Sequence, residues 1–460
     1  MGVDLSRRTA LRLLLGAYAA LWSAREASAQ QNNLSGGRRK VLVIGAGIAG
    51  LAAARDLRSK EFDVIVLEAR HRLGGRIFTD NSLGFPVDLG ASWIHESVGN
   101  PIAELASLNS ISTMVDDDSW IHFRSGLGKE LEKLPESYIR TETSELEKAV
   151  WKYAKTLKAD VSYAAAVKHV NNGSFAGVNR DVFTKYFLSR LEMGFGAPAE
   201  EFSLLYGSNM DSFRGKDLVL PDGYAAIPKT LSAELDIRFG SVVTMIDSSK
   251  PLLRVTASGE TFEADAVVLS VPLGVLKQKR ITFFPELPEY KQQVIDRMGV
   301  GLLDKVVLQF SKPFWPVDTA KFGYMSGQRG EFPEFFNWYK FSKQPVLIAY
   351  LAGLFAKKLE NQSDREVVDE GLAVLRRMFG SKVLAPIGHL VTRWSKDHFA
   401  FGSYSHIPVG ATDADYAYLG MPVGKIFFAG EATSRRFPAT VHGAFMSGVR
   451  AAREASESLV

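Results

Sequence analysis

The stretch KVLVIGAGIAGLAAARDLRSKEFDVIVLEARHRLGGR, residues 40–76, decides the fold of this chain. It opens with a short apolar run at 41–44, as in a strand buried on both faces, and Gly45, Gly47 and Gly50 follow directly. The first glycine permits a tight turn, the second lets a pyrophosphate approach the backbone, and the third lets a helix pack closely on the strand. Residues 51–57 are predicted to form that helix, with its first N–H groups facing the phosphates. The stretch therefore predicts a βαβ unit that binds a dinucleotide.

The end of the second predicted strand, 64–67, supports a dinucleotide site. Glu68 follows that strand and lies 18 residues after Gly50. A carboxylate at this place accepts hydrogen bonds from both hydroxyls of an adenosine ribose and disfavours a 2′-phosphate. A glycine-rich turn without a ligand is the alternative, but the strand, helix and acid in this order favour a bound dinucleotide.

The residues after Glu68 indicate which dinucleotide is bound. Arg70 and Arg76 belong to a run of the form E-A-R-x-R-x-G-G-R. This run resembles the flavin amine oxidases, in which the turn closes over the pyrophosphate of FAD. The resemblance implies an α/β fold, with a Rossmann-type FAD-binding domain and an interleaved α+β substrate-binding domain.

Length and composition predict more than one domain. The chain has 460 residues, of which 46% are hydrophobic and 23% charged, so it is globular and exceeds a single core. We expect a signal peptide, a linker, a discontinuous FAD-binding domain and a discontinuous substrate-binding domain. The signal peptide is predicted at 1–29 and the linker at 30–39. The FAD-binding domain is predicted at 40–110, 225–285 and 395–458, and the substrate-binding domain at 111–224 and 286–394.

The N-terminus predicts export. Arg7 and Arg8 precede an apolar run at 13–22, and Ala27-Ser28-Ala29 follows it. This is the pattern of a twin-arginine signal, although Ala10 stands where a large apolar residue is more common. Ten apolar residues are too few to cross about 30 Å of hydrocarbon, which argues against the alternative of a membrane anchor. We therefore expect a periplasmic bacterial protein that contacts the export machinery transiently.

Charge and cysteine content exclude several classes of site. Without residues 1–29, 51 basic residues face 49 acidic ones, which offers no basic surface for nucleic acid. The chain has no cysteine, so disulfides, thiolate metal sites and a flavin tethered through cysteine are excluded. We expect non-covalent FAD, no metal site and no stable membrane anchor.

A second motif, DLGASWIH at 88–95, resembles the polyamine-oxidising branch of the family closely. The resemblance implies that Ala91, Ser92 and Trp93 lie beside the flavin and that His95 lies at the substrate channel. Glu96 replaces the glycine that is usual in that branch. A structural histidine is the alternative for His95.

Residues 130–195 carry helical patterns that suit a cap over a substrate cavity. Glu192 lies in an apolar stretch, and a buried carboxylate requires a partner or a cationic ligand. Its place resembles one where plant polyamine oxidases hold a glutamate near the reacting amine, whereas an ion pair with an arginine is the alternative. Asp211 is a weaker candidate. Glu192, Glu96 and Asp211 are the carboxylates available for the remaining cationic nitrogens of a polyamine. The run Asp116-Asp117-Asp118 is interpreted as a solvated loop.

Lys305 is the candidate for the centre of catalysis. It is a single charge among Val306, Val307 and Leu308, and a buried ammonium is costly unless it is paired. In the resembling family the matching lysine holds a water against flavin N5, while a surface lysine is the alternative. Residues 227–235 are predicted to form a helix that leads into short strands. Val243, in the second of these strands, matches a valine of the resembling family that contacts the adenine.

The C-terminal part continues the resemblance. Trp394 and Tyr404 match the segment that brings an aromatic wall to the flavin, and Ser403 stands where covalently flavinylated monoamine oxidases carry cysteine. Gly430 and Glu431 are predicted to bind the cofactor, and Glu431 suits a ribityl hydroxyl. A helix from Thr440 and Val441 would direct N–H groups at the flavin pyrimidine and stabilise the negative charge that develops there. Thr440 replaces a tyrosine of the monoamine oxidases, which opens the pocket.

The resemblance implies an amine oxidase that transfers a hydride from the carbon next to nitrogen to flavin N5, with oxygen reduced to hydrogen peroxide. Lys305, Tyr404, His95 and Glu192 are the predicted catalytic residues, and polyamines of the spermidine and spermine class are the expected substrates. Two alternatives remain: an oxidase of monoamines or L-amino acids, and a flavoprotein for dehydrogenation, electron transfer or binding. The 88–95 motif lacks the arginine that would bind an amino acid carboxylate. The sequence does not indicate an oligomeric state.

Overall fold

Five parallel strands form the sheet from which the glycine-rich stretch emerges. The computed structural model describes residues 38–124, 132–171 and 178–459, so the predicted signal peptide and nearly all of the predicted linker lie outside the described residues. The sheet has the order β10-β2-β1-β14-β23, which in chain order reads 3-2-1-4-5, the Rossmann order. Its strands are β1 (Lys40–Ile44), β2 (Asp63–Leu67), β10 (Asp236–Arg238), β14 (Ala266–Leu269) and β23 (Ile426–Phe428). The predicted Rossmann-type α/β class is confirmed.

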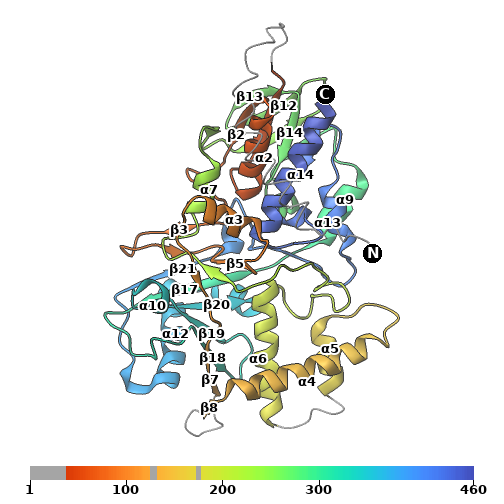
Figure 1. Ribbon diagram of the computed structural model, residues 1–460. Coiled ribbons are helices and arrows are strands. Elements are labelled where there is room, and N and C mark those ends of the chain that lie inside the picture. The colour runs from red at the N-terminus through yellow and green to blue at the C-terminus, as the bar shows by residue number, and fades with distance from the viewer. Residues whose placement is uncertain (1–37, 125–131, 172–177, 460) are drawn as a thin grey trace, which may run out of the picture. The chain divides into compact units, whose positions relative to one another are not determined.

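The two faces of this sheet are covered differently. Helix α2 (Ile48–Ser59) and helix α14 (Val441–Leu459) lie side by side on one face, and their alanines pack on Val41 and Val43 (Figure 1). The other face packs on the four-stranded sheet β13-β12-β11-β15 and on two helices. These elements are β11 (Val243–Asp247), β12 (Leu253–Ala257), β13 (Glu260–Ala264), β15 (Thr282–Phe284), α9 (Glu289–Arg297) and α13 (Ala414–Gly420). The parallel sheet is thus buried on both faces, as its near-continuous apolar strands require.

A second large sheet has seven strands in the order β21-β17-β20-β19-β18-β7-β8. Its strands are β7 (Trp120–Arg124), β8 (Glu132–Leu134), β17 (Leu303–Gln309), β18 (Lys321–Met325), β19 (Glu334–Asn337), β20 (Val346–Ala352) and β21 (Gly388–Val391). Alternate residues of each strand face opposite ways. Val306 and Leu308 pack with helices α11 (Gly353–Leu359) and α12 (Asp364–Phe379), whereas Val307 packs with Val87 and Leu89, which follow the glycine-rich stretch.

A group of helices carries the predicted cap pattern. These are α4 (Glu136–Ala154), α5 (Tyr163–Asn171) and α6 (Val178–Phe195), which share one apolar core. Figure 1 shows α6 beside β18 and β20 of the seven-stranded sheet. The predicted helix over 227–235 is shorter than expected: α7 (Ala226–Leu231) ends before Glu234, whose positive φ of 63° turns the chain into β10.

Short elements complete the described chain. The small sheets pair β3 (Thr79–Asp80) with β4 (Val87–Asp88), β16 (Gly299–Val300) with β22 (Ser405–His406), and β9 (Leu218–Val219) with both β5 (Trp93–Ile94) and β6 (Met114–Val115). The remaining helices are α3 (Pro101–Leu108), α8 (Leu273–Lys277), α10 (Tyr339–Ser342), η1 (Gly380–Lys382), η2 (Trp394–Lys396) and η3 (Glu431–Thr433).

The strands of the five-stranded sheet come only from the ranges predicted for the FAD-binding domain. The strands of the seven-stranded sheet come only from the ranges predicted for the substrate-binding domain. The exact boundaries stay a prediction.

Candidate active site

The glycine turn after β1 is built as the sequence predicts. Gly45 has a positive φ of 100°, and its N–H donates to the carbonyl of Leu67 at 2.8 Å. A Cβ at Gly50 would lie 1.9 Å from the carbonyl oxygen of Gly45, so close packing excludes any side chain there. A Cβ at Gly47 would meet nothing nearer than the carbonyl oxygen of Gly74, at 4.0 Å. Gly50 therefore serves packing, while Gly47 leaves the backbone accessible to a ligand.

Glu68 ties the end of β2 to this turn. It is buried, and its carboxylate accepts hydrogen bonds from the N–H groups of Ala46 at 2.6 Å and Arg70 at 2.8 Å. In open parallel sheets ligands bind beyond the carboxyl ends of the strands, where the strand order reverses. The carboxylate thus lies at the edge of the sheet where a nucleotide binds.

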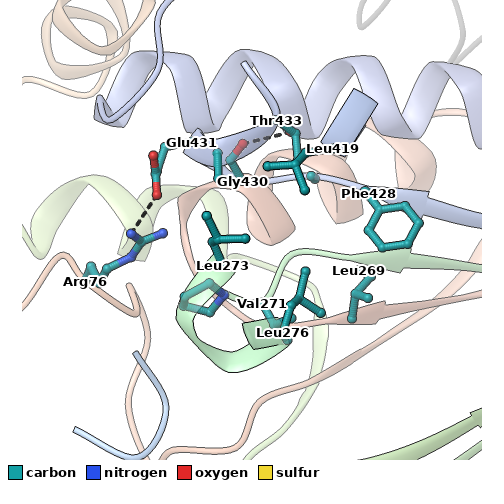
Figure 2. Close-up of a pocket in the computed structure, with 13 residues that line it drawn as sticks. Arg76, Leu269, Val271, Leu273, Leu276, Leu419, Phe428, Gly430, Glu431 and Thr433 are labelled. Carbon is teal, nitrogen blue, oxygen red and sulfur yellow. Dashed lines mark hydrogen bonds and ion pairs between the residues drawn. The ribbon is translucent and has the colours of Figure 1, made fainter. Parts of the chain in front are cut away.

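A small hollow lies at the carboxyl ends of β14 and β23, the neighbouring strands of that edge (Figure 2). Among its lining residues only Arg76 and Glu431 are charged, and Figure 2 shows their charged groups turned toward each other. A Cβ at Gly430, whose φ is 117°, would meet nothing closer than 4.0 Å. The lining residues are Arg76, Leu269, Val271, Pro272, Leu273, Leu276, Leu419, Phe428, Ala429, Gly430, Glu431, Ala432 and Thr433.

The pair Arg76 and Glu431 joins the first motif to the last. The guanidinium of Arg76 lies 2.8 Å from Glu431 and donates to the carbonyl of Ser403 at 2.9 Å. Glu431 is buried and also accepts hydrogen bonds from the hydroxyl of Ser405 and the N–H of Ala439. Because a buried charge requires partners, this pairing fixes the turn at Gly430.

The start of α14 lies next to that turn. Thr440 precedes Val441, the first residue of α14, and its hydroxyl accepts a hydrogen bond from the N–H of Gly443 at 2.9 Å. Thr440 therefore caps the helix. Ala439, whose N–H donates to Glu431, brings the helix start beside the carboxylate.

Arg70, Trp394 and Val243 surround the same region. Arg70 pairs with Asp397 at 2.6 Å, and the indole N–H of Trp394 donates to the carbonyl of Leu89 at 3.2 Å. Val243 is buried at the start of β11, in the apolar core that includes Leu67. The structure thus brings the segment 394–397 against the residues that follow β2.

Lys305 lies on β17 and is buried. Its ammonium donates to the carbonyls of Asp88 at 2.7 Å and Gly90 at 2.6 Å, and to the hydroxyl of Ser92 at 2.5 Å. Burial lowers the pKa of Lys305 to about 8, and the charge of Asp88 opposes this shift. Burial likewise raises the pKa of Asp88 to about 6. The alternative of a surface lysine is therefore wrong, and Lys305 connects the seven-stranded sheet to the 88–95 motif.

The ring of Tyr350 lies 5.4 Å from the ammonium of Lys305, and further aromatic rings pack nearby in the fold. Trp93 contacts Phe336 with ring centroids 5.0 Å apart and Tyr350 at 5.5 Å. Tyr404 donates its hydroxyl to the carbonyl of Met193 at 2.8 Å, at the end of α6. A Cβ at Gly196 would lie 2.9 Å from the ring of Tyr404, so the chain after α6 packs directly on this ring.

The chain matches the family described as flavin containing amine oxidoreductase over residues 48–456. It belongs to that family. It is 36% identical to polyamine oxidase 2 of Arabidopsis thaliana over 431 residues, which cover 90% of this chain and 87% of that protein. It is 35% identical to the protein FLOWERING LOCUS D of Arabidopsis thaliana over 443 residues, 92% of this chain and 56% of that protein. A solved putrescine oxidase with putrescine bound matches with a TM-score of 0.76 and 23% identity, over 91% of this chain and 99% of that one.

Membership makes this chain a flavin amine oxidase with FAD as its cofactor. The residues fit FAD: space remains beside Gly47 and Gly430, a carboxylate ends β2, and the hollow adjoins Gly430. The chain has no cysteine for a thioether link, and FAD is bound non-covalently. Glu68 and the glycine turn would hold the nucleotide half, and the segment around Gly430 and Glu431 the flavin half.

The carboxylates predicted to bind substrate are already engaged in the amine oxidase. Glu192 is buried and forms an ion pair with Arg329, so the ion-pair alternative describes its surroundings. Asp211 pairs with Arg436 at 2.6 Å, and Glu96 accepts a hydrogen bond from the N–H of Phe213 at 2.5 Å. A catalytic role for Glu192 stays a prediction that these contacts do not favour.

His95 lies at the surface, with 53% of its side chain exposed. Its Nδ1 is 2.8 Å from a carboxylate oxygen of Asp217. Although burial raises the pKa of Asp217, the hydrogen bond and charge of His95 hold it below its ordinary value. His95 is thus exposed whereas Lys305 is buried, and the role of His95 at the channel stays a prediction.

The prediction that residues 116–118 form a solvated loop is wrong for Asp116. This residue is buried, accepts a hydrogen bond from the indole N–H of Trp93 at 3.0 Å and pairs with Lys321 at 3.0 Å. A local sequence pattern cannot separate it from the exposed Asp117, because the partner Lys321 lies on a distant strand. Asp116 therefore positions Trp93.

Sequence reasoning missed two further polar residues of this region, Glu334 and Tyr350. Both are buried on central strands of the seven-stranded sheet. The run EFPEFFN at 331–337 contains the signal that identifies Glu334, which is an acid within an apolar strand. Such an acid requires a partner when it is buried, as a buried lysine does.

Two classes of site are absent from the part of the chain that the structure describes. No group of three or more histidines and acids lies close enough to hold a metal ion. No helix of the described ranges combines the length and apolar character needed to cross a membrane.

Proposed function

We propose that this amine oxidase acts on polyamines of the spermidine and spermine class. The observation that carries the proposal is the 36% identity to polyamine oxidase 2 over 87% of that protein. Rice polyamine oxidase 3 shows the same identity over 88% of its length. Buried Lys305 and the half-buried aromatic rings of Trp93 and Tyr404 support the proposal, because aromatic surface suits the methylene chain of such an amine.

The residues of the chain desolvate and orient the amine. FAD supplies the two-electron acceptor for a hydride from the carbon next to nitrogen. Since the neutral amine gives up that hydride, a buried and partly apolar site favours reaction by disfavouring the charged form. Loss of the hydride leaves an imine, which water hydrolyses to an aldehyde, and the two electrons reduce oxygen to hydrogen peroxide.

We infer that Lys305 acts at the reacting end of the amine. Three oxygens of the 88–95 motif hold its ammonium in one place. With a pKa lowered by burial to about 8, it changes from donor to acceptor just above neutral pH. The three N–H groups of the ammonium are directed at these oxygens, so the neutral amine is the form whose lone pair can accept a hydrogen bond from a water.

A second candidate function is demethylation of lysine side chains in proteins. It is favoured by 35% identity to lysine-specific histone demethylase 1 homolog 1 of rice over 439 residues, although the chain spans 52% of that protein. Both reactions oxidise a carbon next to nitrogen, so the substrate must decide between them.

The experiment is a substrate panel with the purified FAD-loaded protein. Spermine, spermidine, putrescine, an aromatic monoamine, several L-amino acids and a dimethyl-lysine peptide are compared for release of peroxide and aldehyde. The proposal expects the highest kcat/KM for spermidine or spermine. Formaldehyde from the peptide would favour the demethylase function. Turnover of a monoamine or an amino acid alone would contradict the polyamine proposal, and reduction by amines without peroxide would indicate a dehydrogenase or an electron-transfer protein.

We further propose that the protein is exported through a twin-arginine signal at residues 1–29. The paired arginines Arg7 and Arg8 before a short apolar run support this. The test compares the periplasmic and cytoplasmic fractions of a bacterium with this pathway, for the natural chain and for a variant with Arg7→Lys and Arg8→Lys. Equal amounts of processed protein in the periplasm for both chains would contradict export by this route.

A further inference from the structure

A row of polar residues crosses the seven-stranded sheet from Lys305. Lys305 on β17 is the register partner of Tyr350 on β20, and Tyr350 is the partner of Glu334 on β19. Directly opposite residues of neighbouring strands project from the same face of a sheet. This face is the one that packs on Trp93 and the 88–95 motif, since Tyr350 and Phe336 both contact Trp93.

Glu334 is a buried carboxylate that lacks sufficient partners. It retains 8% of its surface, and in the described part of the chain its carboxylate interacts with charges and accepts no hydrogen bond. Arg190 and Lys321 attract its charge, while Asp116 and Asp118 repel it, so this group carries one negative charge in excess when all five are ionised. Burial raises the pKa of Glu334, and the two cations only partly oppose this shift. A buried carboxylate in this condition is stabilised by an added cation.

Tyr350, the register partner of Glu334, has a buried hydroxyl without a hydrogen-bond partner in the described ranges. The residue is 4% exposed. A buried hydroxyl without a partner is costly and calls for an explanation. The ring of Tyr350 lies 5.4 Å from the ammonium of Lys305. Tyr350 therefore stands between Lys305 and Glu334 in the row.

We propose that Glu334 and Tyr350 together bind a second ammonium group of the substrate, while the reacting nitrogen lies at the Lys305 end of the row. An ammonium donates to both a carboxylate and a phenol oxygen, so one group satisfies both residues and removes the excess charge. This inference rests on the proposed oxidation of polyamines, and it names the residues that select them over monoamines.

The spacing of the row agrees with this assignment. Lys305 and Glu334 are two strands apart, which is about 10 Å. With bonds of about 1.5 Å, four methylene groups separate two nitrogens by about 6 Å, and a triamine extends further. Trp93 and Phe336 offer apolar surface for the methylene groups between the charges. A short monoamine cannot reach both ends.

The other acids of the region do not compete for this role. Glu192 is paired with Arg329, and Asp211 with Arg436. Glu96 accepts a backbone N–H. Among these candidates, Glu334 is the carboxylate that lacks a hydrogen bond in the described part of the chain.

The experiment follows anaerobic flavin reduction by stopped flow, which separates the substrate Kd from the limiting rate. The natural enzyme, Glu334→Gln and Tyr350→Phe are compared with spermidine, and with a monoamine of similar chain length. For Glu334→Gln we expect the Kd of spermidine to rise at least tenfold, with the limiting rate within threefold. For Tyr350→Phe we expect a rise of three- to tenfold, and the Kd of the monoamine should change by less than twofold in both variants.

Glu331→Gln is the matched control. Glu331 lies three residues before Glu334 and pairs with Arg377, away from the row. Its substitution should leave the Kd of spermidine unchanged, and thermal melting confirms that each variant is folded. A Kd for spermidine within twofold of the natural value in folded Glu334→Gln would overturn the inference, as would equal weakening of the monoamine. If either variant does not fold, the other decides by the same criteria, and Glu334→Leu serves as a second removal of the charge. Failure of spermidine to reduce the natural enzyme would instead overturn the proposed function itself, and this inference with it.

Discussion

The dinucleotide end, meaning the glycine turn after β1 with Glu68, and the seven-stranded sheet are built from different kinds of residue. At the dinucleotide end the decisive positions are glycines, where the missing side chain at Gly47 leaves space and that at Gly50 permits close packing. On the seven-stranded sheet the decisive positions are buried charges and hydroxyls, such as Lys305 and Glu334. A cofactor with many backbone contacts requires room, whereas a small amine requires specific polar groups.

The two regions meet through the 88–95 motif. Its backbone follows the arginine-rich turn, and the carbonyls of Asp88 and Gly90 accept hydrogen bonds from Lys305. The motif therefore connects the arginine-rich turn to the seven-stranded sheet.

The largest effect is expected from a matched pair of glycine substitutions. Gly50→Ala forces a Cβ to within 1.9 Å of the carbonyl oxygen of Gly45, so we expect a loss of about 3 kcal/mol or more in the free energy of unfolding. Gly47→Ala meets no protein atom nearer than 4.0 Å, so the fold should persist while the Kd for FAD rises about 100-fold, or about 2.8 kcal/mol. Circular dichroism melting and FAD titration measure the two effects. The comparison breaks down if Gly47→Ala unfolds as readily as Gly50→Ala.

Lys305→Met should separate the sheet from the dinucleotide end. The substitution removes the group that contacts Asp88, Gly90 and Ser92 but no residue of the glycine turn. We expect the limiting rate of flavin reduction by spermidine to fall by a factor of about 10² to 10⁴, while FAD content is unchanged. Stopped-flow reduction and the flavin spectrum measure these quantities. Loss of FAD with an unchanged rate per flavin would contradict this division of labour.

Two buried histidines near the dinucleotide end predict a loss of stability in acid. Burial lowers the pKa values of His406 and His442 to about 4, against 6.5 for the ordinary group. As the pH falls from 6.5 to 4, the unfolded chain takes up protons that the folded chain does not. The free energy of unfolding is therefore highest above pH 6.5 with respect to these groups. It falls by about 3 kcal/mol for each histidine as the pH is lowered to 4.

His406→Phe tests this account. Neither ring nitrogen of His406 has a hydrogen-bond partner within the described ranges, so an apolar ring is tolerated at neutral pH. Between pH 6.5 and pH 4 the free energy of unfolding should fall by about 3 kcal/mol less in the variant than in the natural protein. Denaturant unfolding at each pH measures this difference. Parallel pH curves for the two proteins would show that His406 is not responsible.

The smallest effect is expected behind the seven-stranded sheet. Ser363 and Glu366 form a capping box at the start of α12. Ser363→Ala should lower the free energy of unfolding by about 1 kcal/mol, with no change in FAD content or in the Kd of spermidine. Denaturant unfolding and anaerobic reduction measure both. A change in spermidine binding would show that the sheet transmits strain from this helix to the site.

The same contrast explains how much could be predicted from the sequence. The glycine turn, Glu68 and their strands are consecutive in residues 40–76, so local order predicted their arrangement correctly. Lys305 was recognised because a charge in an apolar strand is conspicuous. Its contacts with Asp88 and Gly90 join segments more than 200 residues apart, and no local pattern contains them.

The errors have a common physical cause. Sequence patterns do not reveal the burial of Asp116 or Glu334, because burial of an acid depends on which strand faces it. Glu192 was correctly recognised as a buried acid, but the sequence left its partner open, and Arg329 lies in another element. The length of α7 was overestimated, since its end is set by the turn at Glu234. Cross-strand register and ion pairing thus limit what the sequence alone predicts here.

The most direct test of the account is a crystal structure of the fully reduced enzyme with spermidine, prepared without oxygen. The account predicts one end of the amine beside Lys305 and a further nitrogen within hydrogen-bond distance of both Glu334 and the hydroxyl of Tyr350. Spermidine bound with its other nitrogens at His95 and Asp217, and with Glu334 and Tyr350 uncontacted, would contradict it.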